Sequence, residues 1–442
     1  MMRTTSLAPR RVAMFVLNDM RLDSRVRREA GSLSAAGHDV TVYAVMSDAT
    51  SHLSREDVDG YEIVRLPMLM RPSSETSMTT GRAALTTAFG ATRPMLGGTL
   101  HYVANWQLRW SLWARRVAAA VEPADVWHAH DFNTLGLARA LADRHGGALV
   151  YDSHELFTEA GATSVLPAVV RAAIRARERS WTRSASAVLT VNESIADVLR
   201  ERLGVDVTIV RNCAIPPTAD ASPLRDRIGA GPRTPVVMYH GSVTVGRGIG
   251  PLIDGFADPR MNAAHLVIMG YGPLRPAMQA LASRSPARDR IHLLPPVPPD
   301  EVTRWVAGAD VAAMPIEPTT MNHRLSSPNK LFEAIAAGVP VVGPDFPEFR
   351  RVILDSRHGT LGRLHTDHAS GSIVAAIDHL LALDQHERAT MRARCRAAAD
   401  EQWNWSLESR RLLDAYAALA RSAAPSVAPS VRPDAPVPVI DE

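Results

Sequence analysis

Short apolar runs rich in Val and Ile alternate with segments of helical periodicity along most of the chain. Near-continuous apolar strands separated by helices are typical of parallel sheets that helices cover on both faces. The strand candidates are RVAMFVL, DVTVYAV, YEIVRL, DVWHAH, ALVYDS, AVLTV and VTIVRN in the first half, and PVVMYH, HLVIMG, RIHLL, DVAAMP and VPVVG in the second. Helices are predicted at Ser24–Ala36, Leu135–Arg144, Val302–Gly308 and Pro328–Ala337.

The strand candidates form two series, each spanning about 200 residues, which predicts two Rossmann-like, doubly wound α/β domains rather than one barrel. Residues 214–235 concentrate Pro, Gly and polar residues, which is typical of a junction. We therefore expect a first domain over 1–213, a second over 214–400 and a final amphipathic helix over 401–421. The segment 422–442 is rich in Ala, Pro and Ser and is predicted to be disordered.

One helical stretch carries a tryptophan stripe, and it follows a long segment, 67–100, that is rich in Met, Gly, Ser and Thr. The stripe falls at i, i+4, i+7 and i+11 and consists of Trp106, Trp110, Trp113 and Val117. This spacing favours a helix face buried in the core. The alternative is a face that meets a membrane or an apolar acceptor, because the stripe is flanked by Arg109, Arg115 and Arg116.

The composition of the 442 residues is that of a soluble globular protein, with 46% hydrophobic and 21% charged residues. A net charge of +3 is too weak to indicate a nucleic-acid partner, although it favours acidic small molecules or an anionic membrane surface. The two cysteines form no motif, which fits a reducing cytoplasm. The N-terminal apolar run VAMFVL is too short for a signal peptide, and no run is long enough to span a bilayer. We expect a cytoplasmic protein that is at most peripheral on the inner face of the membrane.

The stretch SSPNKLFEAIAAGVPVV combines an anion-binding feature with a carboxylate. Ser327 is a good helix N-cap and Pro328 suits the first helical position, so a helix is predicted to begin there. Its free N–H groups and the charge of Lys330 attract an anion. Glu333 lies one turn beyond Lys330, where it could accept protons from a diol. An ordinary surface ion pair is the alternative interpretation.

Two glycine-rich loops follow predicted strands of the second half. In VVMYHGSVTVGRGIG the glycines let backbone N–H groups approach an oxyanion, and Arg247 supplies a charge. The loop is neither a Walker A motif nor a GxGxxG fingerprint. The stretch MGYGP follows the next strand, and loops at the carboxyl ends of parallel strands converge on one crevice. A diphosphate between Arg247 and Lys330, with a ribose on Glu333, satisfies all of these groups.

Two histidine-containing stretches, HAHD and DSHE, end predicted strands of the first half. Residues two apart on a strand share a face, so His128 and His130 lie together, with carboxylates nearby. This arrangement raises a different hypothesis, a metal-dependent hydrolase with an H-x-H site. In the simplest interpretation these histidines satisfy buried polar partners.

Taken together, the sequence resembles the glycosyltransferases of family 4, from about Arg11 to Ala420 and in consistent order. The resemblance rests on NDMRLDSRVRREAGSLSAAGHDVTVYAV, DVWHAHDFNTLGLARALA, YDSHELFTE, HGSVTVGRG and SSPNKLFEAIAAGVPVV. Members of the family are retaining enzymes of the GT-B fold that use nucleotide-sugar donors. Their final helix passes back across the cleft to the first domain. Glu333 matches the second glutamate of the family's E-x7-E signature, which binds the ribose.

The resemblance implies a set of site residues. The catalytic residues would be His130, Arg247 and Lys330. The donor nucleotide would be bound by Gly241, Ser242, Arg247, Gly270, Tyr271, Asn329, Lys330, Leu331 and Glu333. The acceptor side would include Asp23, Arg25, His154 and Glu155. Because the two cations can stabilise a leaving diphosphate, no metal and no other cofactor is expected.

The expected partners are a nucleotide sugar and a hydroxyl acceptor, either a saccharide or a lipid-linked saccharide, and the expected role is synthesis of cell-envelope polysaccharide or glycolipid. Three departures from the family qualify this expectation. Leu325 replaces the first glutamate of E-x7-E, Ser242 replaces an arginine, and NDMRLDSR replaces a glycine pair after the first strand. They leave a non-catalytic sugar-nucleotide-binding protein as an alternative. The sequence does not fix the sugar, the base, the acceptor or the oligomeric state.

Overall fold

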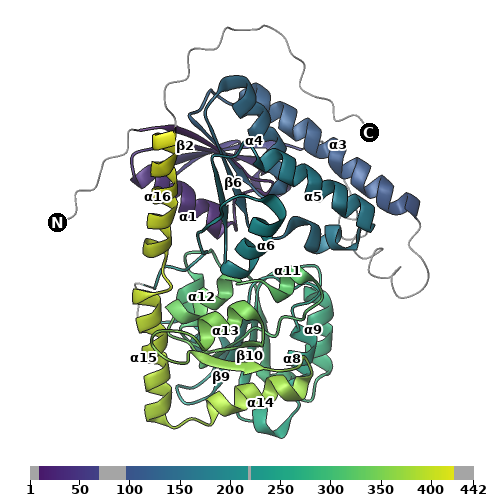
Figure 1. The fold of residues 1–442 in the computed structure, drawn as a ribbon. Helices are drawn as coiled ribbons and strands as arrows, with labels where there is room; N and C mark the ends of the chain where they lie inside the picture. Colours follow the sequence, from purple (N-terminus) through teal and green to yellow (C-terminus); the bar gives the residue numbers. More distant parts are fainter. Residues whose placement is uncertain (1–8, 69–95, 218–220, 423–442) are drawn as a thin grey trace, which may run out of the picture.

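The structure is a computed structural model that describes residues 9–68, 96–217 and 221–422. Two α/β domains lie one above the other in Figure 1, each built around a sheet that helices cover. The first sheet has the strand order β3-β4-β2-β1-β5-β6-β7-β8, and the second has the order β11-β10-β9-β12-β13-β14. The predicted fold class of two doubly wound domains is confirmed.

Strands of the first sheet pair in parallel, with one exception. They are β1 (Arg11–Phe15), β2 (Asp39–Met46), β3 (Arg55–Val58), β4 (Tyr61–Pro67), β5 (Val126–His130), β6 (Ala148–Ser153), β7 (Ala187–Thr190) and β8 (Thr208–Ile209). The exception is β3, which the apolar pattern did not predict and which pairs antiparallel to β4. The sequence REDV is polar, and its pairing depends on a tight turn in which Asp59 and Gly60 both have positive φ.

The strands described in the second sheet all pair in parallel. They are β9 (Val236–His240), β10 (His265–Met269), β11 (Ile291–Leu294), β12 (Val311–Ala313), β13 (Val341–Pro344) and β14 (Gly362–His365). The central strand β9 is buried along its whole length, as an apolar run predicts. Strand β14 was not predicted, because GRLH at the sheet edge is buried only at its two ends.

Helices connect the strands close to the predicted positions. The first domain contains α1 (Ser24–Ala35), α3 (Leu96–Ala120), α4 (Phe132–His145), α5 (Ala168–Thr182) and α6 (Glu193–Leu203). The second contains α7 (Leu224–Ile228), α8 (Ile249–Gly255), α9 (Arg275–Arg284), α10 (Val302–Val306), α11 (Met321–Arg324), α12 (Asn329–Ala336), α13 (Pro347–Ile353), α14 (Ser370–Leu381) and α15 (Gln385–Glu401).

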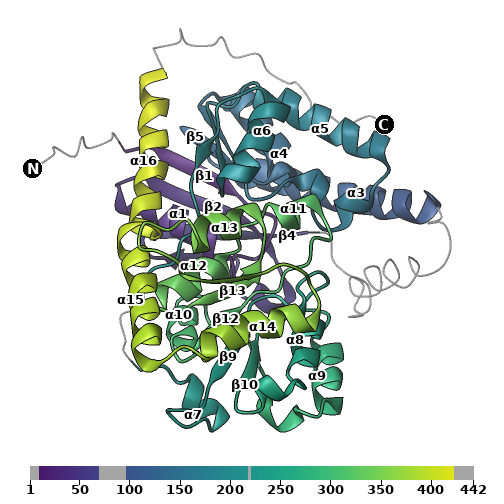
Figure 2. The same cartoon turned by 60° about the horizontal axis from the view of Figure 1, so that its bottom comes forward.

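The final helix, α16 (Trp405–Ser422), joins the two domains. It follows α15, which packs on α12 in the second domain, and it packs on α1 in the first, as Figures 1 and 2 show. Leu412 and Tyr416 are buried in the core beneath α1, and Trp405 donates a hydrogen bond to Ser32 (2.8 Å). The predicted tail, 422–442, lies outside the described residues from 423 onward.

The tryptophan stripe of α3 belongs to the core. Trp113 is fully buried, and its indole N–H donates to the carbonyl of Ala44 (3.3 Å), while Trp110 and Val117 are also buried. The prediction of a core stripe is confirmed for these residues, and the membrane-facing alternative is wrong for them. The side chain of Trp106 and most of the segment 67–100 lie outside the described residues. In the part of the chain that the structure describes, no helix combines the length and apolarity needed to cross a bilayer.

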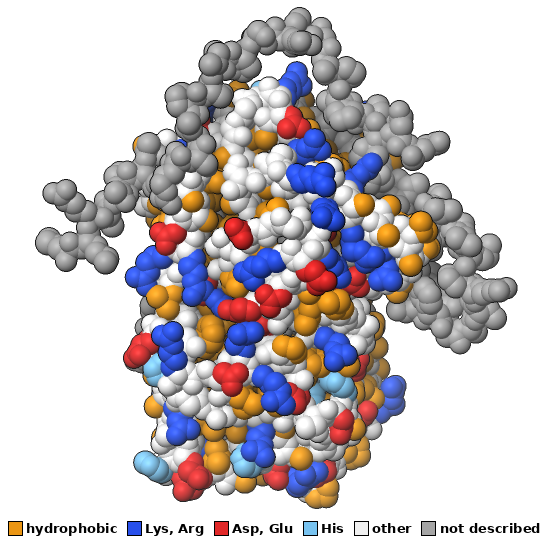
Figure 3. Space-filling view, in the orientation of Figure 1, with side chains coloured by type: hydrophobic (Ala, Val, Ile, Leu, Met, Phe, Trp, Pro, Cys, Tyr) orange, Lys and Arg blue, Asp and Glu red, His pale blue; other side chains and the backbone are white. Residues whose placement is uncertain are grey.

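Charges of both signs lie on the face of the molecule that Figure 3 draws. Basic and acidic side chains are interspersed over the second domain, and more basic side chains lie over the first. Part of the basic charge of the first domain is paired, because Arg171 and Arg175 of α5 both contact Glu159.

Candidate functional site

The start of α12 differs by one residue from the prediction. The helix begins at Asn329, and Pro328 is the N-cap residue, with extended backbone angles (φ −70°, ψ 146°). Ser327 does not cap the helix. Its hydroxyl instead accepts a hydrogen bond from Asn192 of the first domain (3.0 Å). The loop before α12 is thus fixed to the opposite domain, and the helix start lies at the junction between the two domains.

Lys330, in the first turn of α12, is a buried cation without an acceptor. Its side chain is 7% exposed, and Nζ lies 4.0 Å from the ring centroid of Tyr239. Nζ has no hydrogen-bond partner among the described residues. Burial, followed by the positive charge of Arg247, holds the pKa of Lys330 well below its usual range. An anion bound here would oppose both effects by stabilising the protonated ammonium, so the group is suited to an anionic ligand.

Lys330 is also the only lysine in the sequence, although lysine and arginine together number 49. An ammonium is a compact point charge, whereas a guanidinium is a planar fork that needs more room. Nζ lies next to Gly241, where a Cβ would be 3.4 Å away, an ordinary contact distance. The ammonium is therefore placed as a point charge beside the backbone of the glycine loop.

Arg247 lies in the loop between β9 and α8 and is the second cation of the site. Its Nε atom is buried and has no hydrogen-bond partner among the described residues. Glycines with positive φ flank it, Gly246 (78°) and Gly248 (65°), and a Cβ at Gly248 would lie 1.9 Å from the carbonyl oxygen of Pro315. Burial and the nearby Arg247 charge lower the pKa of His323 to about 4. Arg247 thus lies beside a neutral His323, and no ion pair to it is formed among the described residues.

Glu333 is paired with a residue that the sequence did not single out. Its Oε2 atom lies 3.0 Å from Nε2 of His240, the last residue of β9. Although burial opposes it, His240, Arg28 and Lys330 hold the pKa of Glu333 below its usual value. A signal for His240 existed, since it directly precedes the glycine loop. Its contact orients a carboxylate that remains ionised and can accept hydrogen bonds from a diol.

Replacing Glu333 with glutamine should weaken the binding of a nucleotide sugar by about 1.5–3 kcal/mol, because a charge-assisted hydrogen bond is lost while the side-chain volume is kept. Isothermal titration calorimetry on the purified variant measures this loss. Glu401→Gln is a matched control, since that carboxylate is 71% exposed on the second domain. Equal affinities of the wild type and Glu333→Gln would exclude Glu333 from the site.

Two glycines bring the strand ends of the second domain close together. A Cβ on Gly270 would lie 1.9 Å from the carbonyl oxygen of Gly241, and both residues have φ in the range that favours glycine (156° and 107°). The carbonyl oxygen of Ser242 accepts a hydrogen bond from the hydroxyl of Tyr239 (2.6 Å). Tyr271 is 48% exposed. Its partial burial, and then the negative charges of Asp23 and Asp19 in the loop after β1, raise its pKa. Tyr271 is therefore on the side of the second domain that faces this loop.

Two predicted donor-binding residues have other contacts. The side chain of Leu331 is fully buried in the core of the second domain, so its predicted donor contact is not available to the side chain. The apolar face of α12 must pack inward, and Leu331 lies on it. Asn329 donates a hydrogen bond to Ser24 at the start of α1 (3.3 Å). Asn329 thus bridges the two domains.

On the acceptor side, Arg25 is not free to bind a ligand. It is 3% exposed, and its guanidinium donates to both carboxylate oxygens of Asp152 (2.8 and 2.7 Å) and to the carbonyl of Val210 (2.6 Å). A buried ion pair already uses its donors, so this arrangement gives no support to the prediction that Arg25 binds the acceptor. Asp23 caps α1 by accepting from the N–H of Val26 (3.0 Å), and it remains partly exposed.

The ends of β5 and β6 bring His130, His154 and Glu155 together. Nδ1 of His130 lies 3.1 Å from Nε2 of His154, which in turn lies 3.0 Å from Asp152. Although burial opposes it, Asp131 and Asp152 raise the pKa of His154 to about 10. Burial lowers the pKa of His130, and its Nε2 has no partner among the described residues. A neutral His130 therefore lies beside a protonated His154.

Asp131, at the end of β5, has a backbone conformation that the sequence could not predict. Its backbone has φ 63° and ψ 163°, a region that residues other than glycine rarely adopt. Its carboxylate accepts the backbone N–H of His154 (2.9 Å), which holds the ends of β5 and β6 together. Strain of this kind clusters at functional sites, and here it adjoins His130.

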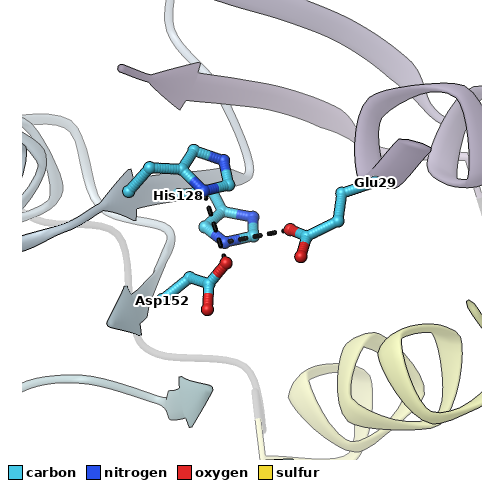
Figure 4. Close-up of side chains that lie close together, drawn as sticks. Glu29, His128 and Asp152 are labelled. Atoms are coloured by element: carbon cyan, nitrogen blue, oxygen red, sulfur yellow. Dashed lines mark ion pairs between the residues drawn. The ribbon is translucent and has the colours of Figure 1, made fainter. Parts of the chain in front are cut away.

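The metal hypothesis concerns a buried cluster in the first domain, and Figure 4 shows Glu29, His128 and Asp152 pointing toward one another from α1, β5 and β6. Ligand atoms of these three residues and His130 lie within 4.8 Å of one another. However, Arg25 pairs with both Asp152 and Glu29, so a guanidinium already supplies the positive charge. The cluster also contacts α16, since the Tyr416 hydroxyl lies 2.8 Å from His128 Nδ1. This arrangement favours a structural ion-pair network over a hydrolytic metal centre.

Comparison with known proteins matches both domains. The family described as "Glycosyl transferase 4-like domain" matches residues 22–218, and "Glycosyl transferases group 1" matches residues 234–383. A D-inositol 3-phosphate glycosyltransferase of Xylanimonas cellulosilytica is 30% identical over 198 residues, which are 44% of this chain and 45% of the relative. A GDP-mannose-dependent alpha-(1-6)-phosphatidylinositol monomannoside mannosyltransferase of Mycolicibacterium smegmatis is 29% identical over 43% of this chain and 50% of the relative. The chain thus spans about half the length of the curated relatives it matches.

Solved structures share the whole architecture at low sequence identity. Sucrose-phosphate synthase of Thermosynechococcus elongatus superimposes with a TM-score of 0.69 at 16% identity, covering 93% of this chain and 99% of that one. HepE of Anabaena, in complex with UDP and glucose, gives a TM-score of 0.67 at 15% identity, covering 92% and 99%. At these identities the similarity establishes the fold.

Proposed function

Since the chain belongs to the family 4 glycosyltransferases, built on the GT-B fold, we propose that it transfers a sugar from a nucleoside diphosphate sugar to a hydroxyl acceptor with retention of configuration. The observation that carries this proposal is a pair of cations, the buried ammonium of Lys330 and the half-buried guanidinium of Arg247. Lys330 and Arg247 each have a side-chain nitrogen without a hydrogen-bond partner among the described residues. A buried, unpaired cation is costly unless a ligand neutralises it. A diphosphate neutralises both.

The neighbouring groups support a nucleotide rather than free diphosphate. Glu333, held by His240, is one helical turn from Lys330 and would repel a second phosphate, but it would accept hydrogen bonds from ribose hydroxyls. Gly241 and Gly270 leave no side chain between the strand ends and the ligand. The ribose and the diphosphate of the donor would thus bind to different residues of the second domain.

The chemical step would be a substitution at the anomeric carbon. The bond between that carbon and the diphosphate oxygen breaks, and a bond to the acceptor oxygen forms on the same face. The acceptor's proton passes to the departing diphosphate, so no carboxylate nucleophile is required. Lys330 and Arg247 would stabilise the negative charge that develops on the diphosphate. His130, kept neutral by burial, would contact the reacting sugar from the first domain.

The relatives guide the choice of acceptor. Their names specify an inositol phosphate in one case and a phosphatidylinositol mannoside in the other, and the second also specifies GDP-mannose. We therefore extend the proposal to a saccharide, cyclitol or lipid-linked acceptor used in glycolipid or cell-envelope polysaccharide synthesis. A lipid-linked acceptor would bring the protein to the cytoplasmic face of the membrane.

Incubating the purified protein with UDP-glucose or GDP-mannose tests the proposal. With D-inositol 3-phosphate or a phosphatidylinositol mannoside as acceptor, we expect release of UDP or GDP and a product whose anomeric configuration, read by NMR, equals that of the donor. Omitting the acceptor is the control for donor hydrolysis. Tight donor binding without transfer or hydrolysis across a panel of sugars and acceptors would favour a non-catalytic binder, and an inverted product would contradict retention.

A further inference from the structure

Glu155 lies at the contact between the domains, directly after β6 of the first. Its Oε2 atom accepts a hydrogen bond from the side chain of Asn322 in α11 of the second domain (3.3 Å). The same asparagine accepts the backbone N–H of Leu156 (3.1 Å). Two hydrogen bonds across the domain boundary thus fix where the Glu155 carboxylate lies relative to the second domain.

The contact with Asn322 brings Glu155 toward the glycine loop that carries Arg247. His323, the residue after Asn322, packs against that loop, since a Cβ on Gly246 would lie 2.7 Å from its ring. Burial and then the carboxylate of Asp131 raise the pKa of Glu155 to about 7, whereas the charges of His154 and Arg247 act in the opposite direction. A half-buried carboxylate therefore lies on the side of the domain contact that faces the Arg247 loop.

A carboxylate close to a diphosphate site needs a partner other than the diphosphate. Two anions repel each other, so hydrogen bonds from uncharged groups favour Glu155 beside a bound donor. Asn322 supplies one such hydrogen bond, to Oε2, and leaves Oε1 for another donor. Sugar hydroxyls are such donors, and the sugar lies between the diphosphate and the acceptor.

The second domain does not supply a carboxylate from position 325. The side chain of Leu325 packs against the apolar core of the first domain, and its carbonyl accepts a hydrogen bond from Asn192 (2.9 Å). The loop before α12 therefore directs an apolar side chain away from the donor. Glu155 reaches the same junction from the opposite domain through Asn322, which is in the helix that ends directly before Leu325.

We propose that Glu155 is a sugar-recognition residue, whose carboxylate accepts hydrogen bonds from hydroxyl groups of the sugar being transferred. This inference rests on the proposed function, because it requires a nucleotide-sugar donor. In this account the second domain binds the nucleotide. The transferred sugar is bound by Glu155 of the first domain, which Asn322 of the second domain holds in place. Specificity for the sugar then depends on the domains being in contact.

The test compares the affinity for a nucleotide sugar with the affinity for the free nucleotide, using calorimetry with UDP-glucose against UDP and GDP-mannose against GDP. Glu155→Ala should bind the preferred nucleotide sugar about 10- to 100-fold more weakly, since a charge-assisted hydrogen bond is lost. It should bind the free nucleotide within about twofold of the wild type, because in this account Glu155 does not touch the diphosphate or the base.

Glu178→Gln is the matched control, since Glu178 is a buried carboxylate of the same domain whose partner is the Tyr151 hydroxyl (2.6 Å). It should leave the ratio of the two affinities unchanged. Equal weakening of nucleotide and nucleotide sugar in Glu155→Ala would assign Glu155 a structural role and overturn the inference, as would no change in either affinity. If the wild type binds neither ligand, the proposed function itself fails, which is a distinct result.

Should Glu155→Ala fold poorly, Glu155→Gln provides the second measurement. The amide keeps the volume and one acceptor oxygen but loses the charge. Its preference between UDP-glucose and other UDP-sugars should fall toward equality, whereas a merely structural role would leave that preference intact. A KM for the donor that rises while the affinity for free UDP is unchanged supports the inference, and an unchanged sugar preference contradicts it.

Discussion

Replacing Lys330 with alanine is expected to lower the turnover number by about 10²–10³-fold, the usual effect of removing one preorganised charge that stabilises a transition state. The reason is the position of its Nζ atom, which is buried over Gly241, close to Arg247, and without an acceptor among the described residues. Steady-state kinetics with a saturating acceptor measures the effect. Lys330→Arg should also be impaired, because a planar guanidinium does not reproduce the position of a point charge.

A matched control is Arg227→Ala, an exposed cation of the second domain, which should leave turnover unchanged. Arg247→Ala should impair turnover as Lys330→Ala does, and the double variant should deviate from the sum of the two by about 0.5–3 kcal/mol, because both cations act on one diphosphate. Strict additivity would indicate that the two residues bind different groups.

Replacing Trp113 with alanine is expected to lower the free energy of unfolding of the first domain by about 3–5 kcal/mol. The indole is fully buried among the side chains between α3 and the sheet, and its N–H donates to Ala44. The alanine variant leaves a cavity and removes this hydrogen bond. Urea denaturation followed by circular dichroism measures the change.

Leu108→Ala on the same helix is the control, since Leu108 is 56% exposed and its loss should change stability by less than about 0.5 kcal/mol. If Trp113→Ala were as stable as the wild type, the indole would not contribute to the core. Loss of vesicle binding without loss of stability would revive the membrane-facing interpretation of the stripe.

The sequence predicted those elements whose burial shows as an apolar run. Four central strands are buried along nearly their full length, β1, β5, β9 and β10. Because both faces of such a strand are covered, its sequence is a mostly apolar run that can be recognised without knowledge of the fold. Two edge strands escaped prediction, β3 and β14, because both are partly exposed and mostly polar. Their pairing is decided by a tight turn or by a neighbouring strand, which no local pattern records.

The candidate site divides in the same way. The sequence could predict three site residues, Lys330, Arg247 and Glu333, because glycine loops and a helix start are local signals. It could not predict the partners of these residues, since His240 and Glu333 meet only when β9 and α12 pack together. Arg25 was assigned to the acceptor for the same reason, because its partner Asp152 is remote in sequence and close only in the fold.

The central claim is that Lys330 and Arg247 share one diphosphate, and a crystal structure of the protein with UDP or GDP tests it most directly. We expect the diphosphate oxygens within about 3.2 Å of Lys330 Nζ and of the Arg247 guanidinium, with the ribose hydroxyls on the Glu333 carboxylate. A nucleotide bound elsewhere, or one whose diphosphate contacts neither cation, would contradict the account.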